Sequence, residues 1–310
     1  MFERKVVGMG SGARLGAVRI LVVLAAVSVV LSENITAFAD LPYSWYHSHG
    51  LLKVIPALWI QPLVESPLYL LILKAALLVF LTAALIGAAV RFSLAGASVL
   101  FFVYLGILNG FADLPDMHLV TLYLLFFLTW LPCGDALSVD AALRKKDSFR
   151  VEQRFSPETG WAVFFLRMIL AVSFFQTGFA KLHNSGWAWT EAWNLKRLIL
   201  ENRFAHLDFN SAWLDYFLSW PDEVWRLLAS VMLLMELFFP AVLFSWRLRR
   251  VYPFVYLVIY LLSAFLSGRI MIHAVLLLLI FLDFDRMLQL TPTLPQDRRQ
   301  GMISLWPRRS

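Results

Sequence analysis

Lys181 has the clearest capacity for acid-base chemistry in this sequence, because it stands near the end of a long apolar run. About fifteen largely apolar residues precede it, from Trp161 to Phe175, and Trp187 and Trp189 follow it closely. A lysine at such a boundary can extend its charge to water along its flexible stem. It can also remain desolvated, which favours the neutral amine and makes the side chain a base. The residues themselves leave both alternatives open.

Other polar residues are expected at a similar depth in neighbouring apolar segments. Polar and ionisable side chains inside a bilayer are costly, so a group of them is a candidate functional pocket. The simpler alternative for each is structural, either a cation that reaches the surface or a hydrogen bond between helices. The candidates that could line one outward-opening pocket with Lys181 are His118, Asn109, Lys74, His273 and Arg269.

Glu236 is a different case, because it lies near the middle of the apolar run from Val231 to Phe244. An unpaired carboxylate at that depth is strongly unfavourable. We therefore expect Glu236 to be neutral or paired within the bundle, as a structural buried charge.

Composition places these residues in a membrane. The chain has 310 residues, of which 60% are hydrophobic and only 15% are charged, a usage outside that of water-soluble domains. The net charge of +6 comes from short basic runs between apolar segments, which are typical of topology signals and not of a nucleic-acid surface. Cys133 is the only cysteine, which excludes a disulfide framework, a cysteine redox pair and a cysteine zinc site.

The apolar runs predict an all-α bundle of about eight transmembrane helices, with an interfacial amphipathic segment around Trp193 to Arg203. Placing both termini in the cytoplasm puts every basic cluster on the inner side of a plasma (inner) membrane, with the candidate pocket facing outward. The predicted spans are about Leu15–Ser32, Pro67–Val90, Phe92–Ala112, Met117–Leu131, Trp161–Leu182, Glu223–Trp246, Val251–Leu266 and Ile270–Met287.

The connecting segments complete the predicted organisation. Residues Glu33 to Ser66 are aromatic and broken by prolines, as expected of an interfacial loop. The first apolar segment is followed by Ala37-Phe38-Ala39, which has the form of a signal-peptide cleavage site, but the segment is long for a signal peptide, so we interpret it as a span. We expect a transmembrane domain over residues 1–290 and a basic cytoplasmic tail over 291–310.

Two motifs, in this order, resemble the vitamin K-dependent γ-glutamyl carboxylase and its bacterial relatives with an HTTM domain. The first is a span beginning Met117-His118-Leu119 that is followed by Ser138-Val139-Asp140. The second is Gly178-Phe179-Ala180-Lys181-Leu182, followed by Gly186-Trp187. The resemblance extends over about Leu15 to Met287.

The resemblance implies that Lys181 is the base that deprotonates a reduced quinone of the vitamin K type, and that His118 belongs to the catalytic site. It further implies O₂ and CO₂ as co-substrates, no metal, and a secreted peptide whose glutamate is carboxylated after the oxygenated quinol removes its γ-proton. Trp187 and Tyr260 join the pocket candidates, since Tyr260 stands where the family has a histidine. Asp116-Met117 also departs from the Asn-Asn that precedes the family's histidine.

Three functions therefore remain open at this point. The first is a carboxylase-like membrane enzyme of the lyase and quinol-epoxidising type, and the second is a non-catalytic factor for the maturation or export of a secreted peptide. The third is an outward-facing metal or haem protein, indicated by His47-x-His49, although that spacing is common by chance. Transport has no support, because no pair of spans shows the broken-helix repeat of secondary transporters.

Overall fold

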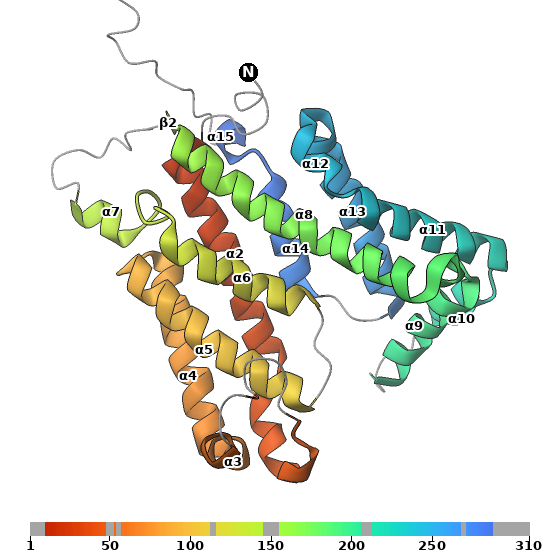
Figure 1. The fold of residues 1–310 in the computed structure, drawn as a ribbon, viewed down its shortest axis with the longest axis horizontal. Helices are drawn as coiled ribbons and strands as arrows, with labels where there is room; N and C mark the ends of the chain where they lie inside the picture. The colour runs from red at the N-terminus through yellow and green to blue at the C-terminus, as the bar shows by residue number, and fades with distance from the viewer. Residues whose placement is uncertain are drawn as a thin grey trace, which may run out of the picture.

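The structure is a computed structural model that describes residues 10–47, 53, 57–111, 116–144, 155–205, 212–267 and 271–287. It is an all-α bundle, as the composition predicts, in which one two-residue strand pair joins β1 (Gly10–Ser11) to β2 (Phe155–Ser156) in antiparallel register (Figure 1). The longer helices are α2 (Gly12–Ser32), α4 (Pro67–Ile86), α5 (Val90–Phe111), α6 (Asp116–Trp130), α8 (Pro157–Ser185), α9 (Ala192–Ala205), α11 (Asp222–Phe238) and α13 (Trp246–Ser267). The shorter elements are η1 (Ile35–Asp40), η2 (Tyr43–Trp45), α3 (Ala57–Glu65), α7 (Val139–Arg144), η4 (Gly186–Thr190), α10 (Ala212–Leu218), α12 (Ala241–Phe244), α14 (Ile272–Leu278), η5 (Leu279–Phe281) and α15 (Phe284–Met287).

Helix α2 is the centre of the bundle. It packs against α4, α6, α8 and α14, and Figure 1 shows it running between these helices. Its side chains are buried along its whole length, from Leu15 through Val22 to Val30. The first apolar segment is therefore an integral part of the hydrophobic core.

Within the described residues, four helical segments are long and apolar enough to cross a membrane, namely 12–40, 67–86, 90–111 and 157–190. Two shorter apolar helices, Met117–Trp130 and Ile272–Phe281, accompany them. The structure thus confirms the all-α fold, and its apolar helices indicate a membrane-embedded protein, whereas the expected number of eight crossings is not confirmed.

Two of the predicted spans are not continuous helices. The sixth, predicted over Glu223–Trp246, divides into α11 and α12 around Pro240, which lacks an N–H group for the helix ladder. The eighth, predicted over Ile270–Met287, divides into α14, η5 and α15.

Other boundaries differ less. The seventh predicted span lies within α13, which begins at Trp246 and also includes Arg247, Arg249 and Arg250. The predicted interfacial loop contains the short helices η1, η2 and α3. The tail at 291–310 lies outside the described residues, so the predicted division between domain and tail is not tested.

Helices α9 and α11 form a second, smaller apolar cluster. Leu195 and Ile199 of α9 pack with Trp225 and Ala229 of α11. The C-terminal part of α11 instead joins the main core through Met235. Helix α9 confirms the predicted helix after Lys181 and places its apolar face against protein, while Trp193 is 63% exposed.

A buried arginine stabilises the break between α14 and α15. The guanidinium of Arg167, on α8, donates hydrogen bonds to the carbonyls of Ile280, Phe281 and Leu282 at 3.0–3.1 Å. These carbonyls lie where the helix ends and lack partners within it. Water cannot satisfy such groups inside a bilayer, so the arginine takes its place.

Two further arginines act in the same way. Arg19 of α2 is fully buried and donates to the carbonyls of Cys133 (2.8 Å) and Leu137, in the segment between α6 and α7. Arg249 donates to the Leu243 carbonyl (2.7 Å) at the end of α12. The Cys133 side chain is buried in this segment, and burial raises the pKa of its thiol to about 11.

The Arg167→Lys variant tests this role of the buried arginines. A lysine keeps the charge but cannot present a planar fork to three carbonyls. We expect a loss of stability on the order of 2 kcal/mol, measured by thermal unfolding in detergent. Arg226→Lys, on an exposed position of α11, is the control and should be nearly neutral. Equal effects of the two changes would contradict this account.

Candidate functional site

Lys181 forms an ion pair with Glu236 across two helices. Its ammonium group on α8 donates to both carboxylate oxygens of Glu236 on α11, at 2.7 and 2.8 Å. The two side chains differ in access, since Lys181 is 20% exposed and Glu236 only 3%. Glu236 is therefore paired within the bundle, one of the two states expected from the sequence, and the pair can be approached from its lysine side.

Gly178 explains the spacing of the Gly-x-x-Lys motif. A Cβ atom at this position would lie 2.7 Å from the Cβ of Glu236 and 3.0 Å from the backbone nitrogen of Leu237. The glycine thus lets the backbone of α11 approach α8. Because residues three apart share a face of a helix, Lys181 points toward the same part of α11 and reaches Glu236.

Aromatic rings surround the ion pair. The ammonium of Lys181 lies 4.3 Å from the ring centroid of Trp189 in η4, within the range of a cation–π interaction. The buried Tyr256 of α13 donates a hydrogen bond to Glu236. Trp187, a predicted pocket residue, is 63% exposed beside these elements. The site thus combines a proton-carrying pair with flat apolar surfaces.

His118 and His273 form a second polar centre. Their ring centroids are 4.7 Å apart with an interplanar angle of 45°, and both residues are buried. They stand near the starts of α6 and α14. Tyr260 of α13 fixes the start of α14, because its hydroxyl accepts the Met271 N–H at 3.1 Å and donates to the Met271 carbonyl at 3.2 Å. Three of the predicted residues thus meet here.

The remaining candidates are Lys74, Asn109 and Arg269. Lys74 donates to the Glu33 carbonyl at 2.9 Å and so caps the end of α2. Asn109 is half-buried in α5, and Arg269 lies outside the described residues. Apart from its pairing with Glu236, the contacts described for Lys181 involve none of the predicted pocket residues. The polar residues thus gather on two helix pairs, α8 with α11 and α6 with α14 (Figure 1).

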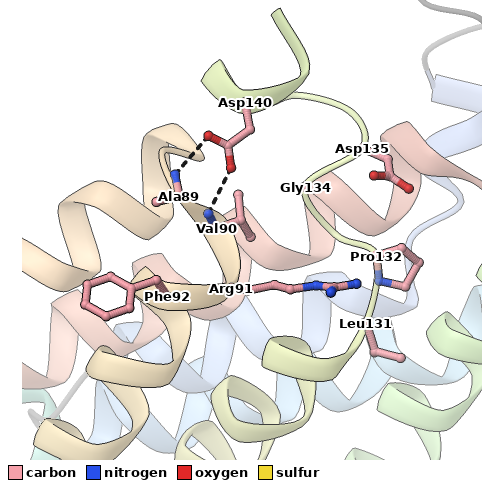
Figure 2. Close-up of a pocket in the computed structure, with 9 residues that line it drawn as sticks. All are labelled: Ala89, Val90, Arg91, Phe92, Leu131, Pro132, Gly134, Asp135 and Asp140. Atoms are coloured by element: carbon pink, nitrogen blue, oxygen red, sulfur yellow. Dashed lines mark hydrogen bonds between the residues drawn. The ribbon is translucent and has the colours of Figure 1, made fainter. Parts of the chain in front are cut away.

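The Ser138-Val139-Asp140 motif has a structural role. The Asp140 carboxylate accepts the N–H groups of Ala89 and Val90 at 2.9 and 3.0 Å, which closes the start of α5 (Figure 2). The Ser138 hydroxyl donates to the Gly134 carbonyl and accepts the Ala141 N–H, which starts α7. The motif therefore ties the α6–α7 connection to the beginning of the third long apolar helix.

No family model, curated protein or solved structure matches this chain. Within the described segments, no three histidine, cysteine or acidic side chains gather as a metal site. His49 of the His47-x-His49 pair lies outside those segments. The fold and site define an all-α membrane protein with a buried lysine–glutamate pair and a buried histidine pair.

Sequence reasoning missed three features of the lysine site. Trp189 was not among the predicted pocket residues, nor were Tyr256 and Gly178. One signal was present, since a single carboxylate within an apolar run requires a cation on a neighbouring helix. Lys181 was available as that cation.

Gly178→Ala should destabilise the protein although alanine favours helices by about 1 kcal/mol over glycine. The added methyl group would have to displace the backbone of α11, which does not yield as a flexible side chain can. Gly12→Ala is the control, because a Cβ there meets its nearest neighbour, the Ala136 Cβ, at an ordinary 3.5 Å. A higher melting temperature for Gly178→Ala than for the unmodified protein would refute the close approach.

Breaking the ion pair should have unequal effects from its two sides. Lys181→Met leaves a carboxylate that is only 3% exposed without its cation, and we expect a loss of about 3–5 kcal/mol. Glu236→Gln should cost less, because the lysine can reach water. The double variant should recover part of the loss seen in Lys181→Met. Thermal unfolding in detergent measures all three variants, and a larger loss for Glu236→Gln would contradict the burial described.

Proposed function

We propose that this chain is a multi-pass membrane enzyme in which the Lys181–Glu236 pair accepts a proton from a reduced quinone. The observation that carries the proposal is the ion pair itself, buried at Glu236 and accessible at Lys181, within the Gly-x-x-Lys-Leu segment. The segment resembles that of the vitamin K-dependent γ-glutamyl carboxylase family, in which the matching lysine is the base.

The pair can perform this step without an isolated charge in an apolar environment. Transfer of a proton from the Lys181 ammonium to Glu236 leaves a neutral amine and a neutral acid, so the net charge of the pair stays at zero. The amine then accepts the proton of the quinol hydroxyl. The pair gains one positive charge as the quinol becomes an anion, and the two charges attract each other in a low-dielectric site.

The rest of the proposed reaction follows the family resemblance. The quinol anion reacts with O₂, and the resulting strong base removes a γ-proton from a glutamate of an exported peptide. The carbanion then adds CO₂. Trp189 and Trp187 offer flat apolar surfaces on which a quinone ring can stack beside the lysine. The role of His118 in this reaction remains a prediction from the resemblance.

The proposed topology places the chain in the plasma (inner) membrane with eight crossing segments and both termini in the cytoplasm. The distribution of basic runs between the apolar segments supports this orientation. Lys181 and the aromatic residues of η4 then face outward, where an exported peptide is accessible.

A second candidate function is a non-catalytic factor for the maturation or export of a secreted peptide. Large aromatic side chains favour it, since Trp187, Trp193 and Tyr216 are 63%, 63% and 59% exposed around η4, α9 and α10. Exposed aromatic residues are typical of docking surfaces. In this function the Lys181–Glu236 pair would be structural only.

The two functions are separated by quinol turnover in Lys181→Ala. The purified protein in lipid discs would receive a vitamin K-type naphthoquinol, a glutamate-containing peptide and labelled CO₂, and O₂ consumption and label incorporation would be measured. We expect the variant to lose turnover while keeping its helical circular dichroism. Lys196→Ala is the matched control, because that lysine pairs with Asp222 at the second apolar cluster.

Quinol oxidation that survives in Lys181→Ala would refute the enzymatic proposal. Normal peptide maturation in cells carrying this variant would favour the non-catalytic function. A density map with quinone added gives an independent measurement, in which the ring is expected beside Lys181 and Trp189.

A further inference from the structure

A pocket separate from the lysine site opens where α5 begins and α6 ends. It has a volume of about 450 Å³, within the range of small-molecule sites of about 300–1,000 Å³. Its lining comes from two parts of the chain, the start of α5 and the connection that follows α6 (Figure 2). The lining residues that matter for recognition are Arg91, Phe92, Leu131, Pro132, Asp135 and Asp140.

Charges of both signs line this pocket. In Figure 2 the Arg91 side chain extends from the start of α5 toward Pro132, and Asp135 projects from the opposite segment. Asp140 uses its carboxylate to accept the N–H groups of Ala89 and Val90 at the helix start, so these two groups are not open to an anion. Arg91 and Asp135 thus bring one guanidinium and one carboxylate to the same pocket, which matches a ligand that carries a negative and a positive group.

The surroundings of the pocket are those of a membrane interface. Helix α5 is one of the helices long and apolar enough to cross a bilayer, and the pocket lies at its end. Phe92 in the pocket lining is 71% exposed, and Trp130, at the end of α6, is 72% exposed. Leu143 of α7 is also 72% exposed. Tryptophan and apolar residues at the end of a membrane helix are typical of the headgroup region.

We propose that this pocket binds the headgroup of phosphatidylethanolamine. The phosphate would pair with Arg91 and the primary ammonium with Asp135, while the acyl chains pass over Phe92 and the apolar face of α5. An anionic lipid fits less well, because two carboxylates line the same pocket. The inference depends on the membrane location of the chain and not on the chemistry of Lys181.

Lipid retention measures this binding directly. The purified protein would be exchanged into mixed micelles with equal amounts of phosphatidylethanolamine and phosphatidylglycerol of the same acyl chains, and the retained lipid would be identified by native mass spectrometry. The unmodified protein should retain phosphatidylethanolamine preferentially. Arg91→Gln should retain it about tenfold less, as expected for the loss of a charged hydrogen bond.

Asp135→Asn makes the test specific, because it removes the negative charge that the proposal assigns to the ammonium and keeps the Arg91 guanidinium. We expect this variant to lose its preference and to retain phosphatidylglycerol at least as well. Arg247→Gln, an exposed arginine outside the pocket lining, is the control and should behave as the unmodified protein. Melting curves of all variants establish that each is folded.

Three results would overturn the proposal. The first is unchanged retention in both Arg91→Gln and Asp135→Asn, and the second is a preference of the unmodified protein for phosphatidylglycerol. The third is displacement of the lipid by glycerophosphoethanolamine at equal concentration, which would assign the pocket to a soluble zwitterion. Loss of quinol turnover in Lys181→Ala has no bearing on these outcomes, so the two proposals can fail separately.

Discussion

Backbone carbonyls that lose their helical partners in an apolar environment are the constraint on which this structure depends. Water is not available there, so each helix break needs a donor from the protein. Arg167, Arg19 and Arg249 are such donors. Arg167 and Arg19 connect a long helix to a break elsewhere in the chain, whereas Arg249 bonds the end of the helix that immediately precedes its own. The broken α14–α15 segment and the α6–α7 connection can therefore lie within the bundle without exposing unpaired carbonyls.

The lysine site has a different physical basis. Glu236 is almost completely buried, and its charge is compensated by Lys181 on another helix. Trp189 contacts the lysine, and Tyr256 contacts the glutamate. The close approach at Gly178 brings the helices near enough for this contact. An arrangement of this kind holds a proton between two groups whose combined charge is zero, which is the property that proton transfer to or from an apolar substrate requires.

The two motifs that carry the family resemblance have different structural roles. Gly178 and Lys181 build the candidate site, whereas Ser138 and Asp140 hold the start of α5 against the connection after α6. The same anchoring leaves a pocket with charges of both signs at the end of α5. The anchoring contacts and the pocket lie at the start of α5, whereas the ion pair lies near the ends of α8 and α11. Helix α2 packs against both α6 and α8 and so connects the two regions.

The sequence by itself determined the class of the protein, because a composition of 60% hydrophobic residues and long apolar runs permits only membrane helices. It also indicated Lys181, and it required Glu236 to be neutral or paired.

Only the tertiary structure decided that these two residues meet. Lys181 lies about 6 Å from the end of α8, and Glu236 about 21 Å from the start of α11, by the rise of a helix. Their contact therefore needs α11 to extend beyond the end of α8, as Figure 1 shows. The first half of α11 packs with α9. Hydrophobic periodicity assigns residues to helices but not the stagger between helices, which depends on packing contacts such as that at Gly178.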